Sequence, residues 1–133
     1  MKKTYLLFLF LIFFLGACKD LNKNDIIGTW KSDNKTLFLF HNNNTFEVKN
    51  IPEAILFDNL SSNKLYSGTG NWELIYLENR WKIELSFGKY LDFSSYCCYL
   101  DIEKGFYSKK FLWKLYFYDG AQDTKYYLYR VNP

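Results

Sequence analysis

Apolar and polar residues alternate along most of the chain. Between residues 80 and 87 every second residue is apolar, namely Trp81, Ile83, Leu85 and Phe87. Residues 110–118 repeat this pattern, with an apolar series of Phe111, Trp113, Leu115 and Phe117. Because successive side chains of a strand point to opposite faces, the period of two predicts half-buried β-strands. The same reasoning predicts further strands at residues 36–40, 45–49, 71–77, 96–103 and 125–131.

Short polar segments separate these strands and predict turns, since Asn, Asp and Gly tolerate the backbone angles that turns require. They are His41–Asn44, Glu78–Asn79, Lys104–Gly105 and Asp119–Gly120. Residues 51–59 are predicted to be helical, because Pro52 suits a first helical turn and is followed by Glu53 and Ala54. The expected fold class is therefore all-β. We expect an antiparallel meander that closes into a small barrel of about seven or eight strands, with one short helix.

The first 17 residues have the composition of a secretory signal peptide. Lys2 and Lys3 form a positive start, and residues 5–15 are apolar and rich in Phe and Leu. This apolar run lies in the length range of a signal-peptide core. It is shorter than the roughly 20 residues that a membrane-spanning helix needs. We therefore expect it to be removed from the mature protein.

The end of this segment, Leu15-Gly16-Ala17-Cys18, resembles the lipobox of bacterial lipoproteins. That resemblance implies a diacylglycerol thioether on Cys18, cleavage before it, and acyl chains that anchor the chain in a membrane. Lys19 stands where an inner-membrane retention signal would have Asp, so the resemblance implies the outer membrane of the envelope, facing the periplasm or the surface. We expect residues 1–17 to be the signal peptide, 18–25 a polar tether, and 26–133 the barrel domain.

The charge balance of the mature chain does not indicate a nucleic-acid partner. Removal of Lys2 and Lys3 leaves 15 basic residues against 14 acidic ones. The basic residues form no run of the kind that binds phosphate backbones. Pro is also scarce, which favours a folded rather than a disordered chain.

A second resemblance concerns both ends of the predicted barrel. Ile27-Gly28-Thr29-Trp30, followed by a strand, a turn and Phe46-Glu47-Val48, resembles the opening of lipocalin-like domains. Arg130, on the last predicted strand, corresponds to the late arginine of such domains. The resemblance implies that Gly28 permits a sharp entry, that Trp30 closes one barrel end, and that Arg130 packs over Trp30. A guanidinium stacked on an indole contributes around 1 kcal/mol.

Few residues of this chain are suited to catalysis. His41 is the only histidine and lies in a predicted turn, so a histidine-based triad has one possible base. No Cys/His spacing predicts a metal site. Glu47, Glu73 and Glu84 are candidates for a carboxylate pair by residue type alone, and we expect them to face solvent on amphipathic strands. The sequence predicts neither an enzyme nor a cofactor.

Cys97 and Cys98 are adjacent within a predicted strand. Their side chains should therefore point to opposite faces, one into the core and one outward. We favour two unpaired small apolar residues over a redox role.

Two functions of different kinds remain open. In the first, the barrel holds a small apolar ligand and serves as an envelope carrier or sensor. In the second, the protein's own side chains fill the barrel, and a partner protein or glycan binds an outer face that carries Tyr116, Tyr118, Tyr127 and Tyr129. The tether or the helix at residues 51–59 is a candidate cover for those tyrosines. A large enclosed cavity favours the carrier, and a filled core favours the surface.

Overall fold

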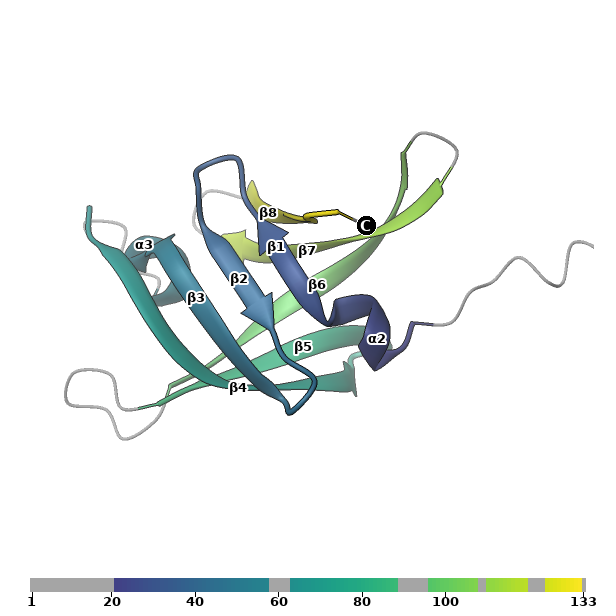
Figure 1. The fold of residues 1–133 in the computed structure, drawn as a ribbon, viewed down its shortest axis with the longest axis horizontal. Coiled ribbons are helices and arrows are strands. Elements are labelled where there is room, and N and C mark those ends of the chain that lie inside the picture. Colours follow the sequence, from purple (N-terminus) through teal and green to yellow (C-terminus); the bar gives the residue numbers. More distant parts are fainter. Residues whose placement is uncertain (1–20, 58–62, 89–95, 108–109, 120–123, 133) are drawn as a thin grey trace, which may run out of the picture.

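The computed structural model describes residues 21–57, 63–88, 96–107, 110–119 and 124–132 (Figure 1). Its strands form one closed antiparallel barrel, in which each strand pairs with the next and the last pairs with the first. The strands are β1 (Gly28–Lys31), β2 (Leu37–Phe40), β3 (Thr45–Pro52), β4 (Leu65–Leu77), β5 (Arg80–Phe87), β6 (Tyr96–Tyr107), β7 (Lys110–Asp119) and β8 (Thr124–Arg130). Two short helices accompany them, α2 (Lys23–Ile26) and α3 (Glu53–Phe57). The expectation of an all-β meander that closes into a small barrel is confirmed.

Several local expectations differ from the structure. The helix predicted at residues 51–59 is wrong at its start, because Ile51 and Pro52 belong to β3 and α3 begins at Glu53. The predicted turn at Lys104–Gly105 is wrong, because β6 continues to Tyr107 and pairs Lys104 with Trp113 and Gly105 with Leu112. Glycine is typical of turns, but Gly105 lies within the strand and is paired with β7 like its neighbours. Part of the predicted tether is folded as well, since Asn22 caps α2 and forms reciprocal hydrogen bonds with Asp25.

The barrel interior is packed with aromatic rings. Phe38 lies at its centre, with ring centroids 5.6 Å from Phe40, 5.9 Å from Phe46 and 6.0 Å from Phe117. Phe46 makes an edge contact with Phe87 at 5.1 Å. The core residues Phe38, Phe46, Ile83, Leu85, Leu100, Leu115 and Leu128 are all fully buried. A cavity large enough for a water molecule would leave exposed area on its lining, so no such cavity faces these side chains.

The strands differ in length, and this shapes one end of the barrel. Pairing between β3 and β4 stops at Thr45 and Asn71, whereas β4 continues to Leu77. The hairpin of β4 and β5 therefore extends past β3, at the end of the barrel where α2 lies (Figure 1). The barrel closes between β1 and β8, where Trp30 pairs with Arg130.

Candidate interaction surface

Four tyrosines form one continuous patch on the outer face of β7 and β8. We call Tyr116, Tyr118, Tyr127 and Tyr129 the tyrosine face. They point outward because the alternate residues Leu115 and Leu128 are fully buried in the core. Tyr116 and Tyr127 are direct partners across the two strands, with ring centroids 5.6 Å apart. Tyr127 and Tyr129 stack at 6.1 Å.

Two lysines lie over these rings. Lys125 Nζ is 4.6 Å from the ring centroid of Tyr116. Lys114 Nζ is 5.7 Å from the ring centroid of Tyr127 and 5.9 Å from that of Tyr129. Such cation–π contacts contribute about 0.5–1 kcal/mol each at exposed sites. They place a positive charge over each of these three rings.

Glu103 lies on β6, the strand next to β7, and contacts Tyr127 and Lys125. Tyr127 Oη donates a hydrogen bond of 2.9 Å to Glu103 Oε2, and Lys125 Nζ lies 3.5 Å from the same oxygen. The hydrogen bond from Tyr127 lowers the pKa of Glu103, and Lys125 adds to this effect against an opposing contribution from burial. The pKa of Tyr127 is raised, first by burial and then by its hydrogen bond to the carboxylate. The carboxylate and the phenol thus stabilise each other's ordinary protonation state.

The tyrosine face is open to solvent in part. Tyr118 is 56% exposed and Tyr129 is 39% exposed, whereas Tyr116 is only 9% exposed. The expectation that the helix near residues 51–59 covers these side chains is wrong for its described part, since α3 packs against β3. Tyr116 is covered instead by its own neighbours, Lys125 and Tyr127.

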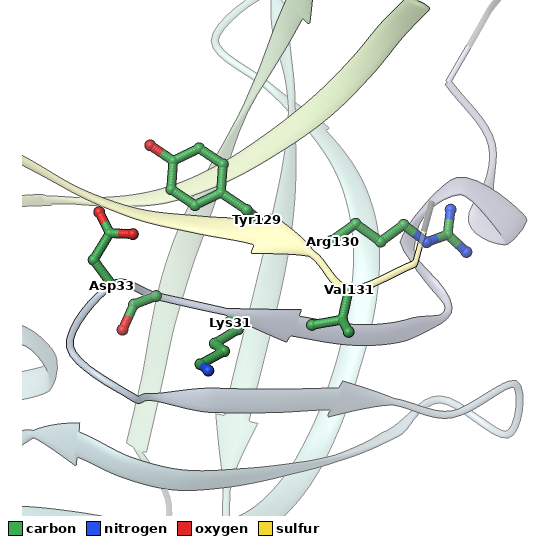
Figure 2. Close-up of a pocket in the computed structure, with 6 residues that line it drawn as sticks. Lys31, Asp33, Tyr129, Arg130 and Val131 are labelled. Carbon is green, nitrogen blue, oxygen red and sulfur yellow. The ribbon is translucent and has the colours of Figure 1, made fainter. Parts of the chain in front are cut away.

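An open hollow of about 380 Å³ adjoins the patch at the seam between β1 and β8 (Figure 2). Its lining includes Lys31, Asp33, Tyr129 and Val131. Tyr129 belongs to both features, because it pairs with Lys114 on one side and with Lys31 on the other. The hollow and the tyrosine face therefore form one surface, with aromatic rings, both signs of charge and a concave edge.

The residues expected to close the barrel lie together at its α2 end. Trp30 is fully buried, and its Nε1 donates a hydrogen bond of 2.7 Å to the carbonyl oxygen of Ile26. Arg130 points toward α2 in Figure 2 and donates to the carbonyls of Asp25 at 3.2 Å and Ile27 at 2.7 Å. Gly28 has a φ of 127°, and a Cβ there would lie 3.5 Å from Arg130 Nη2. The glycine is therefore required for its backbone angle, since a Cβ would make only an ordinary contact with the guanidinium.

The residues considered for catalysis occupy outer surfaces. His41 Nε2 lies 3.1 Å from Glu47 Oε1, and both side chains are substantially exposed. Glu73 and Glu84 are direct partners on β4 and β5, which places two like charges opposite each other. Among the described residues, no three His, Cys, Asp or Glu side chains form a group that could hold a metal ion.

Cys98 is half-buried and packs against the hydrophobic core. The side chain of Cys97 lies outside the described residues, as does Cys18 with the whole signal segment. No helix in the described part of the chain is long and apolar enough to cross a membrane.

The residues that organise this surface were not identified from the sequence. Lys31 and Glu103 lie on β1 and β6, and only the strand register brings them beside the tyrosines. Lys114 and Lys125 share the strands and the outward face of Tyr116 and Tyr127, so the alternation already places them on this side, but nothing in the sequence assigned them a role. The fold and this surface define a small closed β-barrel protein with an aromatic outer patch. Compared with known proteins, the chain matches no family model, no curated protein and no solved structure.

Proposed function

We propose that this protein is a lipid-anchored lipoprotein of the bacterial outer membrane, with a non-catalytic barrel that binds a partner protein through its tyrosine face. The anchor rests on the resemblance of Leu15-Gly16-Ala17-Cys18 to a lipobox. We place the binding site on the outer surface because the interior of the barrel is filled by side chains. Phe38, Phe46 and Leu85 are fully buried and leave no room beside them for a ligand.

The chemistry of the tyrosine face suits recognition. Tyrosine is enriched at protein interfaces because it offers a large, rigid contact area and a polar tip. The ring of Tyr127 is hydrogen-bonded to Glu103 and that of Tyr116 lies under Lys125, and these contacts reduce the side-chain freedom that is lost when a partner binds. A glycan is the alternative occupant, since it also packs its apolar face on aromatic rings.

Photo-cross-linking in cells tests the surface. Benzoylphenylalanine in place of Tyr118 is expected to give a discrete covalent adduct. The same group in place of Asn71, an exposed residue on the opposite wall of the barrel, should give none. An adduct that proteases remove supports a protein partner, whereas one that only glycosidases remove identifies a glycan. Absence of an adduct at Tyr118, or equal adducts at both positions, contradicts the proposal.

Two further measurements test the anchor and the carrier alternative. Cys18→Ser should abolish the acyl mass of the protein and release it from the membrane fraction. Unchanged lipid labelling of this variant would contradict the anchor. A small apolar molecule that co-purifies with the chain in stoichiometric amount, identified by mass spectrometry, would favour the carrier instead.

A further inference from the structure

The tip of the β4–β5 hairpin carries an exposed apolar cluster that the proposed binding surface does not use. Tyr76 and Trp81 are direct partners on the two strands, with an edge-to-face ring contact at 5.3 Å. Tyr76 is 61% exposed, Trp81 41% and the neighbouring Leu77 40%. We call Tyr76, Leu77, Arg80 and Trp81 the hairpin tip.

The exposure of these rings follows from the topology. Tyr76 continues the inward-facing series of β4 that begins at Trp72, which is itself 2% exposed. The neighbouring strand β3 has no pairing with β4 beyond Asn71, so no described strand lies beside the later residues of β4 on that side. Tyr76 and Trp81 thus follow the inward-facing series of their strands but lie beyond the buried core.

The polypeptide enters the barrel at this same end. Leu21, the first described residue, packs against the hydrophobic core. Lys23 Nζ lies 5.7 Å from the ring centroid of Trp72 and 2.6 Å from the carbonyl oxygen of Asn42. In Figure 1, α2 and the β4–β5 hairpin lie at the same end of the barrel. Tyr76 stands four residues beyond Trp72, which corresponds to about 13 Å along the strand.

The length of chain between the barrel and Cys18 is short. Three residue steps separate Cys18 from Leu21, and a fully extended chain covers at most about 11 Å over that distance. If Cys18 carries acyl chains, as the proposed function holds, Leu21 lies within about 11 Å of the lipid surface. The barrel end that contains α2 therefore stays at the membrane.

We propose that the hairpin tip rests in the headgroup region of the membrane that holds the lipid anchor. Trp and Tyr are the residues that favour this region, because their rings are apolar while their N–H and O–H groups remain hydrated. Arg80 is exposed at the tip, where its guanidinium can pair with lipid phosphate. The tether makes this contact intramolecular, so even a weak affinity of the tip for lipid is sufficient.

This contact also orients the barrel. The acyl chains fix one point, and the tip fixes a second point on the same end. The tyrosine face lies along the outer wall of β7 and β8, so it remains accessible from the aqueous side when the barrel stands on its α2 end.

Fluorescence quenching by lipid tests the proposal. The full lipidated chain is reconstituted into phosphatidylethanolamine and phosphatidylglycerol vesicles whose acyl chains carry bromine, which quenches nearby tryptophan. Wild-type emission should be quenched, and Trp81→Phe should lose most of that quenching. Trp113→Phe is the matched control, because it removes a half-buried tryptophan outside the tip and should retain the quenching. Equal quenching of the wild type and Trp81→Phe would overturn the proposal.

A second variant places a reporter at the far end of the barrel. Leu65, at the start of β4, is 62% exposed. Leu65→Trp in the Trp81→Phe background should not restore the quenching, and restored quenching would also overturn the proposal. The intact mass of each preparation separates the two proposals. Protein without acyl mass contradicts the lipid anchor itself, whereas acylated protein with an unquenched Trp81 contradicts only the membrane contact of the hairpin tip.

Discussion

Trp30 and Arg130 lie opposite each other on β1 and β8, and both donate hydrogen bonds to carbonyl groups at the C-terminal end of α2. The indole binds the carbonyl of Ile26, and the guanidinium binds those of Asp25 and Ile27. The first and last strands are therefore joined twice, by their own pairing and through a shared set of carbonyl groups. This arrangement satisfies backbone acceptors at the end of α2 that the helix itself leaves free.

Substitution of these two residues should reveal their coupling. Trp30→Ala is expected to lower the free energy of unfolding by about 3–5 kcal/mol, because a fully buried indole is lost. Arg130→Ala should cost about 1–3 kcal/mol through its two charge-assisted hydrogen bonds. The double variant should lose less than the sum, since both residues hold the same segment. Urea unfolding of the four proteins measures this, with Lys31→Ala as an exposed control on β1. Strict additivity would contradict the coupling.

Gly70 should be intolerant of any side chain. A Cβ at this position would lie 2.3 Å from the carbonyl oxygen of Ser86 and 2.8 Å from the ring of Phe46. Because one of these atoms belongs to the backbone, Gly70→Ala is expected to destabilise the barrel by about 1–3 kcal/mol. Gly88→Ala is the matched control, since a Cβ there meets nothing within 4 Å. Thermal unfolding of both variants checks this prediction, which fails if the two melt alike.

The Tyr127–Glu103 contact should produce a pH dependence at the acidic side. The folded pKa of Glu103 lies below its ordinary value of 4.5. Its contribution to stability is therefore complete above that value and is lost as the pH falls through the folded pKa. Tyr127→Phe removes the main cause of the shift, so the Glu103 pKa should rise toward its ordinary value.

Carbon-detected NMR titration of the Glu103 carboxyl group measures this change directly. Tyr129→Phe is the control, because Tyr129 belongs to the same face and stacks on Tyr127, whereas the hydroxyl that donates to Glu103 is that of Tyr127. The prediction is wrong if the Glu103 pKa is the same in Tyr127→Phe and in the wild type.

Replacing one of the two facing carboxylates, Glu73 and Glu84, by a positive charge should stabilise the barrel. Like charges directly opposite each other on neighbouring strands are unfavourable, whereas opposite charges are favourable by roughly 0.2–1 kcal/mol. Glu73→Lys is therefore expected to raise the free energy of unfolding by a few tenths of a kcal/mol or more. Urea unfolding at low and high salt checks this, because screening should reduce the gain. A destabilised variant, or a gain that salt leaves unchanged, would contradict the electrostatic explanation.

The sequence by itself determined the class of fold and the central part of most strands, although β4 begins at Leu65 and β6 continues to Tyr107, beyond the predicted ranges. The alternation in residues 80–87 gave the bounds of β5 directly, because a side chain's face is decided locally by its position in the strand. Local signals were weaker at α2, whose four residues are too few for helical periodicity, and at Lys104–Gly105, where a glycine proved to be paired within β6.

Only the tertiary structure decided what surrounds each outward side chain. The sequence already placed the four tyrosines on one face, since that requires only strand parity. It did not place Glu103 beside Tyr127, because these two residues come from β6 and β8 and meet only through the register of the closed sheet. The exposure of Trp81 likewise depends on where the shorter strand β3 ends, which is a property of strand pairing and not of the alternation along β5.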